Sequence, residues 1–508
     1  MVRDPAASAV QPSHPASPGY PAVVTLAAGA IFLSILDATV ANLAVTDMHD
    51  SFPDASVTDL TWVISLYAIV FASFLAPAGR LADVLGRRRL YTAGMGLFTA
   101  ASLLCAVAPG LPALLVARGL QGLGAAAMIP ASLAVLLVDV TPRRRGAAIG
   151  LWSAAASAAA AVGPSIGGIL IDTVGWRSVF FINLPLGIAL LLGIRAVRRS
   201  VPRKQGLPDV LGTALLAAGT GLVVLGITQG QEWGWGGPRV LGCLVGGLGL
   251  LAATLVRAGR HPRPALQTRL WRSRDFALAN LVSFFFGAAL YSWLLVGALF
   301  LVEVWQYSRM AAGVSMIPSA LLSAAVAALV GRSLGRRSPH IAVFCGATAL
   351  VAAELWLGVT LSSQAALWSM WIPVGLLGGA GIGAISTGVN SAAALSVKPA
   401  DFAGATGLNM AVRQIGGALG VAVLAAILPA RTASEPGPYS HVVFFSCAAA
   451  AVAGLLGLGF SQRRGRDRDR DRGQDRGRNR GRRAVLPETP AIAEPLPSRR
   501  LPLFRKSP

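Results

Sequence analysis

Long apolar runs recur along most of the chain, and they constrain its fold more than any other feature. Each run extends over about 20 residues, which is the length that an α-helix needs to cross the hydrocarbon core of a bilayer. Of the 508 residues, 54% are hydrophobic and 13% are charged, whereas about a quarter of the residues in a soluble domain are charged. Because lipid cannot satisfy exposed backbone polar groups, the sequence predicts an all-α integral membrane protein.

The runs predict about fourteen transmembrane helices. The expected spans are residues 21–45, 62–78, 90–108, a run that ends near 140, 146–171, a run that starts near 179, 210–228, 240–256, 276–302, 311–330, 341–361, 367–394, 404–430 and 442–459. Clusters of arginine fall in alternate loops, and basic residues in short loops stay in the cytoplasm. A missed span would reverse this alternation, and it does not reverse. We therefore expect a multi-pass protein of the inner (plasma) membrane with both termini in the cytoplasm.

The net charge of +22 would indicate a nucleic-acid partner in a soluble protein. Here the arginines lie in the alternate loops and in residues 461–508, so anionic membrane lipid is the simpler partner and no nucleic acid is expected. Residues 461–508 alternate Arg with Asp, which predicts a disordered Arg-rich cytoplasmic tail, either held at the inner leaflet or solvated without a role. Residues 1–20, rich in Pro, Ser and Ala, predict a disordered cytoplasmic N-tail.

One predicted loop, Gly79–Arg89 with the sequence GRLADVLGRRR, carries a specific pattern. The pattern G-x-L-A-D-x-x-G-R-R resembles the signature loop between spans two and three of the major facilitator superfamily of secondary transporters. That resemblance implies two halves of about six spans that open alternately to each side. It also implies a gating role, closing the inner side, for the residues of the pattern, which are Gly79, Asp83, Gly86, Arg87 and Arg88.

A weaker copy of the loop, GRSLGRR at Gly331–Arg337, follows the second of the last six runs. The repeat predicts an N-terminal six-helix bundle in residues 21–200 and a C-terminal six-helix bundle in residues 275–460. Residues 208–257 then form two inserted helices between the halves. Superfamily members with such an insertion are the fourteen-span drug:proton antiporters of the EmrB/QacA type, which this chain resembles. A monomer is the default state in that family.

Asp37 lies deep in the first apolar run, in the segment LDATVANLA. An ionised Asp at the centre of a bilayer costs roughly 2.5–3.5 kcal/mol, so this carboxyl is a candidate for proton exchange. The alternative is an Asp that only pairs helices. The segment resembles a first-span motif of the fourteen-span antiporters, which usually closes with Pro where this chain has Thr46. That departure leaves the end of the helix open.

Arg118 lies in the fourth run, in the segment ARGLQGLGAA. Arginine keeps its proton, so within a span it needs a partner or a water-lined cavity. The segment resembles the fourth-span motif of the same family, which implies a role in proton coupling for Arg118 and a supporting polar role for Gln121. The alternative is a structural arginine held by carbonyl groups.

Gly163, Pro164, Gly167 and Gly168 form the pattern GPSIGG in the fifth run. Small residues let membrane helices approach closely, so packing alone would explain them. The pattern also resembles the antiporter signature, which is typical of exporters more than importers. The segment WRSVFFINLPLG at Trp176–Gly187 resembles the same branch and is expected to shape the outer entry to the sixth span.

The second half carries further polar residues inside apolar runs. Glu354 is a candidate for a second proton site, whereas Glu303 is expected at the water boundary. Arg413 would neutralise a carboxyl or an anionic substrate, or else hold helices together. The candidates for the lining of the substrate cavity are Asn42, Gln121, Asn390, Asn409 and Arg413.

These features predict a proton-coupled antiporter that exports small lipophilic or cationic drugs or antibiotics from the cytoplasm. No Walker loop is present, so protons rather than a nucleotide are the expected partner of the substrate. The four cysteines and five histidines lack metal-ligand spacing, so neither a metal nor a cofactor is expected.

Three alternatives stay open. The first is a dedicated exporter of one self-made secondary metabolite, which would confer self-resistance. The second is an importer of the same superfamily, which the GPSIGG pattern disfavours. The third is a polytopic membrane protein without transport activity. An enzyme would need paired carboxylates or clustered His and Cys near an interface, and a sensor would need a soluble domain; the sequence offers none of these, so we expect no enzymatic activity.

Overall fold

The computed structural model describes residues 20–194, 209–334, 338–428 and 435–460, and every regular element in these ranges is helical. Both predicted tails lie outside the described residues except for Tyr20, and so does the end of the repeated loop, residues 335–337. The helices are α1 (Tyr20–Ser51), α2 (Val57–Leu85), α3 (Arg87–Ala106), α4 (Leu111–Asp139), α5 (Arg145–Val174), α6 (Ser178–Phe181), α7 (Asn183–Gly193), α8 (Val210–Thr228), α9 (Gly230–Trp233), α10 (Pro238–Arg260), α11 (Arg274–Leu299), α12 (Arg309–Ser333), α13 (Pro339–Thr360), α14 (Ile372–Leu395), α15 (Phe402–Ile427) and α16 (Pro436–Leu458). Short helical turns join some of them, namely η1 (Pro142–Arg144), η3 (Thr268–Arg272), η4 (Phe300–Val304), η5 (Leu367–Trp371) and η6 (Pro399–Asp401).

Among the described residues, 12 helices are long and apolar enough to cross a membrane. The chain is therefore a multi-pass membrane protein, and the expected count of about fourteen spans is not reached by this criterion. The remaining two expected spans coincide with α3 and with residues 178–193. The first turn of α3 consists of Arg87, Arg88 and Arg89, which lower its hydropathy, and Ser178–Gly193 is apolar but shorter than a span.

Helix ends follow local sequence signals more closely than the apolar runs do. α1 continues past the expected end at Val45 to Ser51, because no helix breaker occurs before Pro53 and the residue before a proline disfavours helix. α2 begins with a capping box in which Ser56 and Asp59 exchange hydrogen bonds. It ends at Gly86, whose φ of 105° is open only to glycine at low cost, so the turn into α3 depends on this residue.

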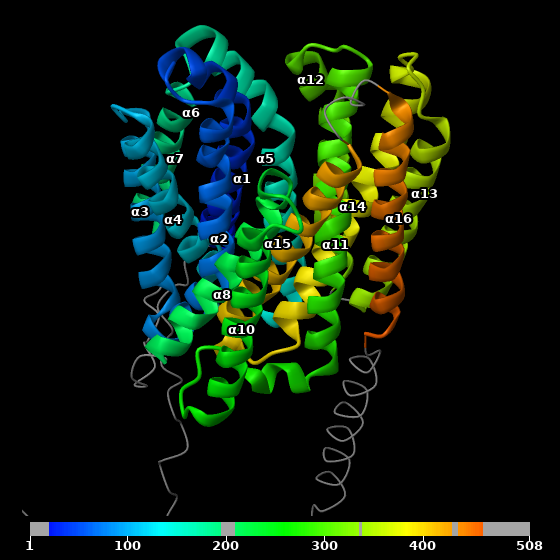
Figure 1. Ribbon diagram of the computed structural model, residues 1–508. Coiled ribbons are helices and arrows are strands. Elements are labelled where there is room, and N and C mark those ends of the chain that lie inside the picture. The colour runs from blue at the N-terminus through cyan, green and yellow to red at the C-terminus, as the bar shows by residue number, and fades with distance from the viewer. Residues whose placement is uncertain (1–19, 195–208, 335–337, 429–434, 461–508) are drawn as a thin grey trace, which may run out of the picture. The chain divides into compact units, whose positions relative to one another are not determined.

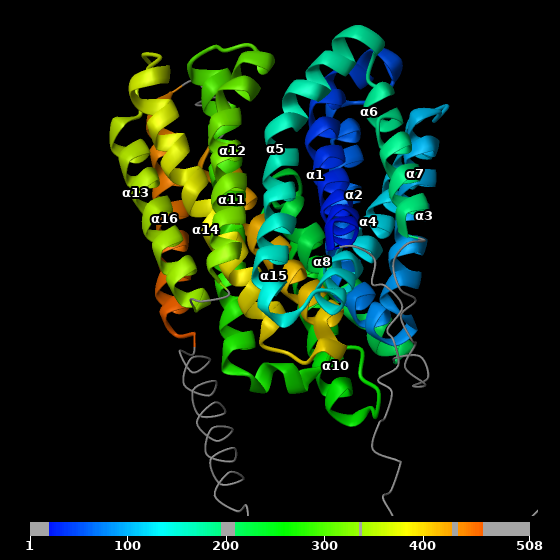
Figure 2. The ribbon, with the colours of Figure 1, turned by 180° about the vertical axis from the view of Figure 1, so that it is seen from behind.

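The helices α1–α7 pack mainly on one another, and so do α11–α16. Two pairs of helices join these groups: α5 packs along α12, and α2 packs along α15. Figures 1 and 2 show α5 and α12 side by side in opposite views. We call the contact between the two groups the seam. The term covers the α5–α12 and α2–α15 pairs and the smaller contacts of α14 with α5 and of α4 with α15.

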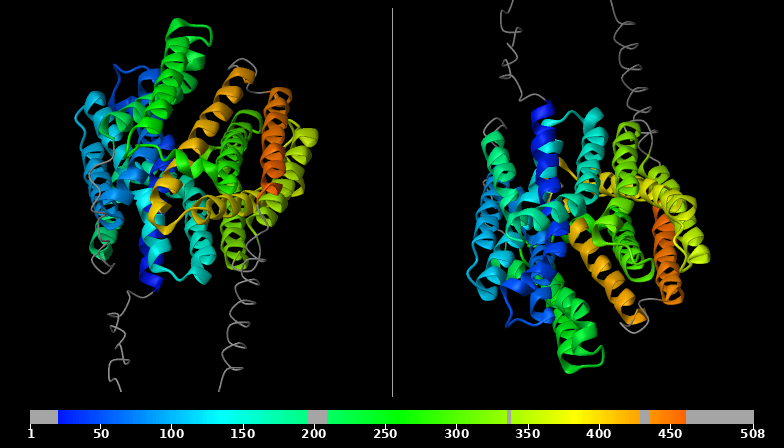
Figure 3. Two further views of the ribbon diagram at one scale, coloured as in Figure 1. Left: turned by 90° about the horizontal axis from the view of Figure 1, so that it is seen from below. Right: turned by 90° about the horizontal axis from the view of Figure 1, so that it is seen from above.

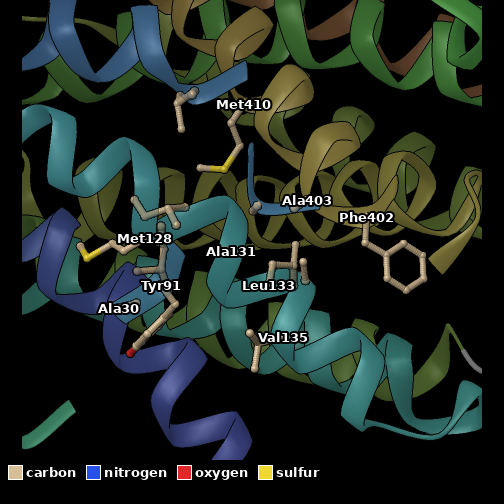
Figure 4. Packing of buried hydrophobic residues seen from close by; sticks show 14 of the residues in the cluster. Ala30, Tyr91, Met128, Ala131, Leu133, Val135, Phe402, Ala403 and Met410 are labelled. Carbon is tan, nitrogen blue, oxygen red and sulfur yellow. The ribbon is translucent and has the colours of Figure 1, made fainter. Parts of the chain in front are cut away.

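The packing across the seam is apolar at one end. A single hydrophobic cluster contains residues of α1, α3 and α4 together with residues of α15. Figure 4 shows part of this cluster, including Ala30, Tyr91, Met128, Ala131, Ala403 and Met410. The Tyr91 hydroxyl is buried there and donates a hydrogen bond to the carbonyl oxygen of Leu26, 3.0 Å away. The polar groups described below are therefore set in a close-packed apolar frame.

The helices α8 and α10, in the segment that the sequence predicts as an insertion, pack on each other and lie beside the seam (Figure 3). α8 contacts both α2 and α15, so it touches both helix groups. A bidentate ion pair closes the base of the insertion, with Arg257 Nη2 2.8 Å from Asp209 Oδ1. The Arg257 guanidinium lowers the pKa of Asp209 to about 2. Because this pKa is depressed, the pair contributes stability above pH ~4 and loses it only as the pH falls through about 2.

The close approach of α3 and α4 leads to a specific prediction about stability. A Cβ on Gly94 of α3 would lie 2.7 Å from the backbone nitrogen of Met128 in α4, whereas a Cβ on Gly96 would meet no atom within 4 Å. We expect Gly94→Val to destabilise the fold by about 1–3 kcal/mol through overpacking. Gly96→Val, two residues along the same helix, is the matched control and should change little. Thermal unfolding of the purified protein in detergent measures both; equal melting temperatures for the two variants would contradict the α3–α4 contact.

Candidate functional site

Asp37 lies on α1 with its carboxylate buried at the centre of a polar cluster, 1% exposed. Its Oδ2 atom accepts a hydrogen bond from Arg118 Nη1 of α4 at 2.8 Å. Its Oδ1 atom accepts two more, from Gln121 Nε2 at 2.8 Å and from Asn183 Nδ2 of α7 at 2.7 Å. Ser102 of α3 completes the cluster by accepting from Gln121 Nε2 at 2.7 Å. Side chains from α1, α3, α4 and α7 thus converge on one carboxylate.

Arg118 is fully buried and is held on several sides. Its Nε atom donates to the carbonyl oxygen of Val63 at 2.9 Å, and Nη1 donates both to Asp37 and to Gln121 Oε1, the latter at 2.6 Å. The rings of Tyr67 and Phe180 lie over the guanidinium group, the first with its centroid 4.3 Å from Cζ. Within the described part of the chain, the buried Nη2 atom has no hydrogen-bond partner. Among the same residues, Asp37 is the acidic side chain that pairs with this arginine.

The cluster brings three of the sequence candidates together and adds three residues that the sequence did not single out. Asp37, Arg118 and Gln121 meet, and Gln121 is fully buried as a ligand of Asp37 rather than a lining residue of an open cavity. Asn183 was included only in a segment expected at the outer entry, yet its amide reaches Asp37. The available signal was a lone polar residue in an apolar run. The same signal applies to Ser102 and Tyr67.

Asp83 occupies a second site, at the end of the bundle where the arginine-rich loops meet, which we call the basic end. Its carboxylate accepts backbone hydrogen bonds from Ala403 at 3.3 Å and from Gly404 at 2.8 Å, in the first turn of α15. The free N–H groups at a helix N-terminus favour a negative charge there. Arg87 pairs with Asp83 at 3.3 Å and also donates to the carbonyl oxygen of Pro399. Asp83 therefore joins α2 to α15 across the seam.

Other charged groups gather at the basic end. Arg269 pairs with Asp401 at 2.9 Å, and the guanidinium of Arg145 lies over the ring of Phe402. Arg144 lies over the ring of Tyr20, so the start of α1 is at this end too. At the other end, Trp176 Nε1 donates to Ser51 at the end of α1.

Glycines bring the backbones of the seam together at the basic end. A Cβ on Gly79 would strike the carbonyl oxygen of Ala403, and one on Gly407 would strike that of Leu75. In the other helix pair, a Cβ on Gly150 of α5 would lie 2.7 Å from the Cα atom of Gly331 of α12. Gly331 is the first residue of the repeated loop segment, and this residue lies at the seam. Side chains larger than hydrogen would hold both helix pairs apart.

The GPSIGG segment of α5 makes close contacts on two faces. A Cβ on Gly163 would strike Thr39 of α1, and one on Gly167 would lie 2.9 Å from Val40. On the other face, Pro164 lies against Gly313 of α12, and Met310 is the nearest residue to Gly168. This is the small-residue packing that the sequence predicted for the segment, and it joins α1, α5 and the seam.

Glu354 is completely buried between α13, α16 and α11. Ser446 Oγ lies within hydrogen-bonding distance of both Glu354 Oε1 and the carbonyl oxygen of Ala289. A hydroxyl has one hydrogen to donate, so both contacts are satisfied if Glu354 carries a proton and donates it to Ser446. The Oε2 atom has no hydrogen-bond partner among the described residues. The exposed Glu303 lies at a helix end, as expected.

For the proton-coupled transport that the sequence predicts, we expect Glu354→Gln to behave as wild type does, because the glutamine amide can donate to Ser446 as the neutral acid does. Glu354→Leu, which removes the polar group, should lower the melting temperature, since Ser446 loses one of its two hydrogen-bond partners. Gradient discharge and thermal unfolding measured on the same preparations check both results. A loss of gradient discharge in Glu354→Gln alone would make Glu354 a proton carrier.

The remaining candidates divide into two kinds. Asn409 is a packing residue, because its amide accepts from Ser283 at 2.9 Å and donates to the carbonyl oxygen of Ala279 on α11. Asn42 is exposed on α1 and does not join the Asp37 cluster. Asn390 and Arg413 lie together: Arg413 Nη2 donates to Asn390 Oδ1 at 3.1 Å. Within the described ranges, no three His, Cys, Asp or Glu side chains come together as metal ligands would.

Comparison with known proteins gives a consistent picture. The family model described as Major Facilitator Superfamily matches residues 27–421. The multidrug resistance protein Stp of Mycobacterium tuberculosis (strain CDC 1551 / Oshkosh) is 34% identical over 406 residues, which are 79% of this chain and 74% of that protein. The tetracenomycin C resistance and export protein of Streptomyces glaucescens is 31% identical over 422 residues, 81% of this chain and 76% of that protein.

Among solved structures, the proton:xylose symporter XylE, of the same superfamily, superposes with a TM-score of 0.63. The match covers 87% of this chain and 95% of that structure, at 12% sequence identity. At this identity the likeness concerns the arrangement of helices and not the substrate.

Proposed function

Because this chain belongs to the Major Facilitator Superfamily, a family of transporters, we propose that it is a proton-coupled antiporter that exports small lipophilic drugs or antibiotics from the cytoplasm. The observation that carries the proposal is the buried Asp37–Arg118 pair, 2.8 Å apart, on helices beside the seam. Relatives named for multidrug resistance and for tetracenomycin C resistance and export support the direction of transport and the class of compound.

The two oxygens of Asp37 have different partners, which gives protonation a defined consequence. Gln121 and Asn183 donate to Oδ1, and Arg118 donates to Oδ2. A proton arriving from outside on Oδ2 would break only the bond to Arg118. The buried guanidinium would then lack its counter-charge, a change worth about 3–5 kcal/mol when one partner of a buried pair is removed. We propose that this energy drives the change to the inward-facing state.

The contacts of Asp83 stabilise the opposite state of the proposed cycle. They hold α2 against the start of α15 at the basic end, so they favour the state closed at that end. Asp83 and Arg87 are thus proposed as gating groups, and Asp37 as the group that carries the proton. Release of the proton to the cytoplasm would restore the Asp37–Arg118 pair and return the protein to the state closed at the basic end.

The finer organisation is part of the same proposal. We propose fourteen spans of the EmrB/QacA type, with α3 and the α6–α7 segment as the additional two; α3 packs along α4 and α7 packs on α3. The domains would be the six-helix bundles of residues 21–200 and 275–460, with 208–257 inserted. The basic end would face the cytoplasm, with both termini inside, in the inner membrane. We propose a monomer as the transporting unit.

The experiment that tests the function is proton-coupled efflux in everted vesicles that contain the full chain. A pH-gradient dye reports discharge as a panel of neutral, cationic and anionic lipophilic compounds is added in turn. Discharge by at least one compound, absent in vesicles without the protein, is the expected result. If no compound of the panel discharges the gradient, the proposal fails for drug antiport.

A dedicated exporter of one self-made metabolite is the second candidate, because the relative from Streptomyces glaucescens is named for a single compound. The fold and the proton cycle would be unchanged. The toxicity profile of a deletion strain separates the two: sensitivity to many unrelated compounds indicates a multidrug exporter, and sensitivity to one indicates a dedicated exporter.

A further inference from the structure

Arg413 is a buried arginine in the middle of α15 for which the proton cycle has no use. Its side chain lies at the junction of α15, α14 and α5: Nη2 donates to Asn390 Oδ1 at 3.1 Å, and Asn390 Nδ2 donates to Ser153 Oγ at 3.2 Å. Arg413 is 8% exposed. Because α14 and α15 belong to one helix group and α5 to the other, this arginine lies at the seam, where the transporter must open and close.

The charge of Arg413 has no counter-charge among the described residues. Arg118 has Asp37 as its partner, whereas no acidic side chain in the described part of the chain pairs with Arg413. Glu354 is bonded to Ser446 in the packing of α13 and α16. Charged side chains inside spans are costly unless they are paired or face a polar cavity. Arg413 therefore places a positive charge without a described counter-charge at the seam.

The guanidinium group also keeps most of its hydrogen-bonding capacity. It has five N–H donors, and a single hydrogen bond to Asn390 uses one of them. In contrast to Nη2 of Arg118, no nitrogen of Arg413 is both fully buried and without a partner, so its remaining donors retain access to space in the seam. A group that served only to hold α14 against α15 would have no need of these accessible donors.

Polar side chains of both helix groups surround this position. The hydroxyl of Tyr291 on α11 donates to Oε1 of Gln414, the residue after Arg413, at 2.6 Å. Asn390, which accepts from Arg413, donates in turn to Ser153 of α5. The surroundings of Arg413 are therefore polar on the sides of α5, α11 and α14.

We propose that Arg413, assisted by Asn390 and Gln414, binds an anionic group of the exported compound, with a carboxylate as the best match. The planar guanidinium binds a carboxylate through two parallel hydrogen bonds, which gives both strength and geometry. The inference rests on the proposed export function and replaces the cationic substrate class expected from sequence with lipophilic compounds that carry a negative charge. A cationic compound would meet an uncompensated like charge at this position.

Binding of a matched pair of probes to the purified full-length protein tests the proposal. The probes are 9-anthroate and its uncharged amide, which share the same ring system, and quenching of the protein's tryptophans reports binding. We expect the wild type to bind the carboxylate about tenfold or more tightly than the amide, the size of a hydrogen-bonded charge contact. Equal binding of the two probes, or binding of neither, would overturn the inference without any variant.

Variants then test whether Arg413 causes the preference for the carboxylate over the amide. Arg413→Gln should abolish the carboxylate preference while leaving amide binding unchanged, and Arg413→Lys should retain part of it. Arg260→Gln, which removes the same charge from the exposed end of α10, is the matched control. A purely structural role of Arg413 would weaken both probes equally, and that result contradicts the proposal. If neutral compounds discharge the pH gradient while the carboxylate preference is absent, antiport stands and this inference alone fails.

Discussion

Asp37→Asn should abolish discharge of the pH gradient by every exported compound while substrate binding persists. An asparagine can keep its oxygen toward Gln121 and Asn183, which donate to Asp37 Oδ1 in the native protein. Its amide nitrogen would then face Arg118 Nη1, donor against donor. The variant thus resembles the protonated state permanently and has no proton to exchange.

Two measurements separate loss of coupling from loss of fold. Gradient discharge in everted vesicles reports coupling, and binding of an exported compound to the purified protein reports the fold and the cavity. Asp54→Asn is the control, because Asp54 is an exposed acid in the loop that follows the same helix. We expect the control to match wild type in both measurements.

A second variant tests the role of Arg118, the partner of Asp37. Arg118→Gln leaves Asp37 buried without its counter-charge, which should destabilise the protein by about 3–5 kcal/mol. The double variant Asp37→Asn, Arg118→Gln removes both charges and should recover much of this stability, but not transport. If Asp37→Asn discharges the gradient as wild type does, the pair is structural, and the proton must be carried elsewhere.

The sequence was sufficient to identify the membrane class and the candidate acid, because both follow from the cost of placing charge in lipid. Asp37 and Arg118 are each conspicuous within an apolar run, and that cost implies that each has a partner. Which partner could not be predicted, since the residues are 81 positions apart and the rotation of each helix about its axis decides what meets. For the same reason, the sequence could not predict that Asn183 would donate to Asp37.

The rotation of each helix about its axis also decides which of the expected cavity residues contact another helix instead. Asn409 and Arg413 lie four residues apart on α15, so both lie on one side of the helix. Asn409 faces α11, where Ser283 and the carbonyl oxygen of Ala279 satisfy it, whereas Arg413 reaches Asn390 on α14. A polar residue in a span indicates a partner but not whether that partner is another helix or a substrate. Only the contacts seen in the structure distinguish a polar residue that binds another helix from one that is free to bind a substrate.

Helix ends were predictable where a local signal existed and not where the hydrophobic pattern alone was used. Gly86 ends α2 at a positive φ, a conformation that glycine adopts at low cost. The apolar run predicts an end near residue 45, whereas α1 continues to Ser51, because no proline or glycine interrupts the helix there. Acidic side chains are compatible with a helix that continues into water beyond the membrane.

Asp83→Asn should shift the protein toward the state that is open at the basic end. The carboxylate accepts from the N–H groups of Ala403 and Gly404, one through each oxygen. An asparagine can replace one of these acceptors only, and it lacks the charge that attracts Arg87 and the N-terminus of α15. Hydrogen bonds to charged groups contribute about 1.5–3 kcal/mol each, so a loss of about 2 kcal/mol changes the equilibrium roughly 30-fold.

A distance across the seam measures this shift directly. Spin labels on cysteines introduced at Arg89 and Lys398, in a background without the four native cysteines, report the separation at the basic end; both positions are exposed. In Asp83→Asn, the population with the longer distance should increase. Asp59→Asn is the matched control, because Asp59 caps the opposite end of the same helix through Ser56.

The proposed cycle also predicts how the distance at the basic end responds to pH in wild type and in the two variants. In wild type, acidification should lengthen the 89–398 distance, since protonation of Asp37 is proposed to favour the state open at the basic end. In Asp83→Asn, the longer distance should already prevail at neutral pH and respond little to acid. In Asp37→Asn, the distance should be long at every pH, because that variant resembles the protonated state. An unchanged distance distribution in Asp83→Asn would mean that the glycine contacts at Gly79 and Gly407 close the basic end without it.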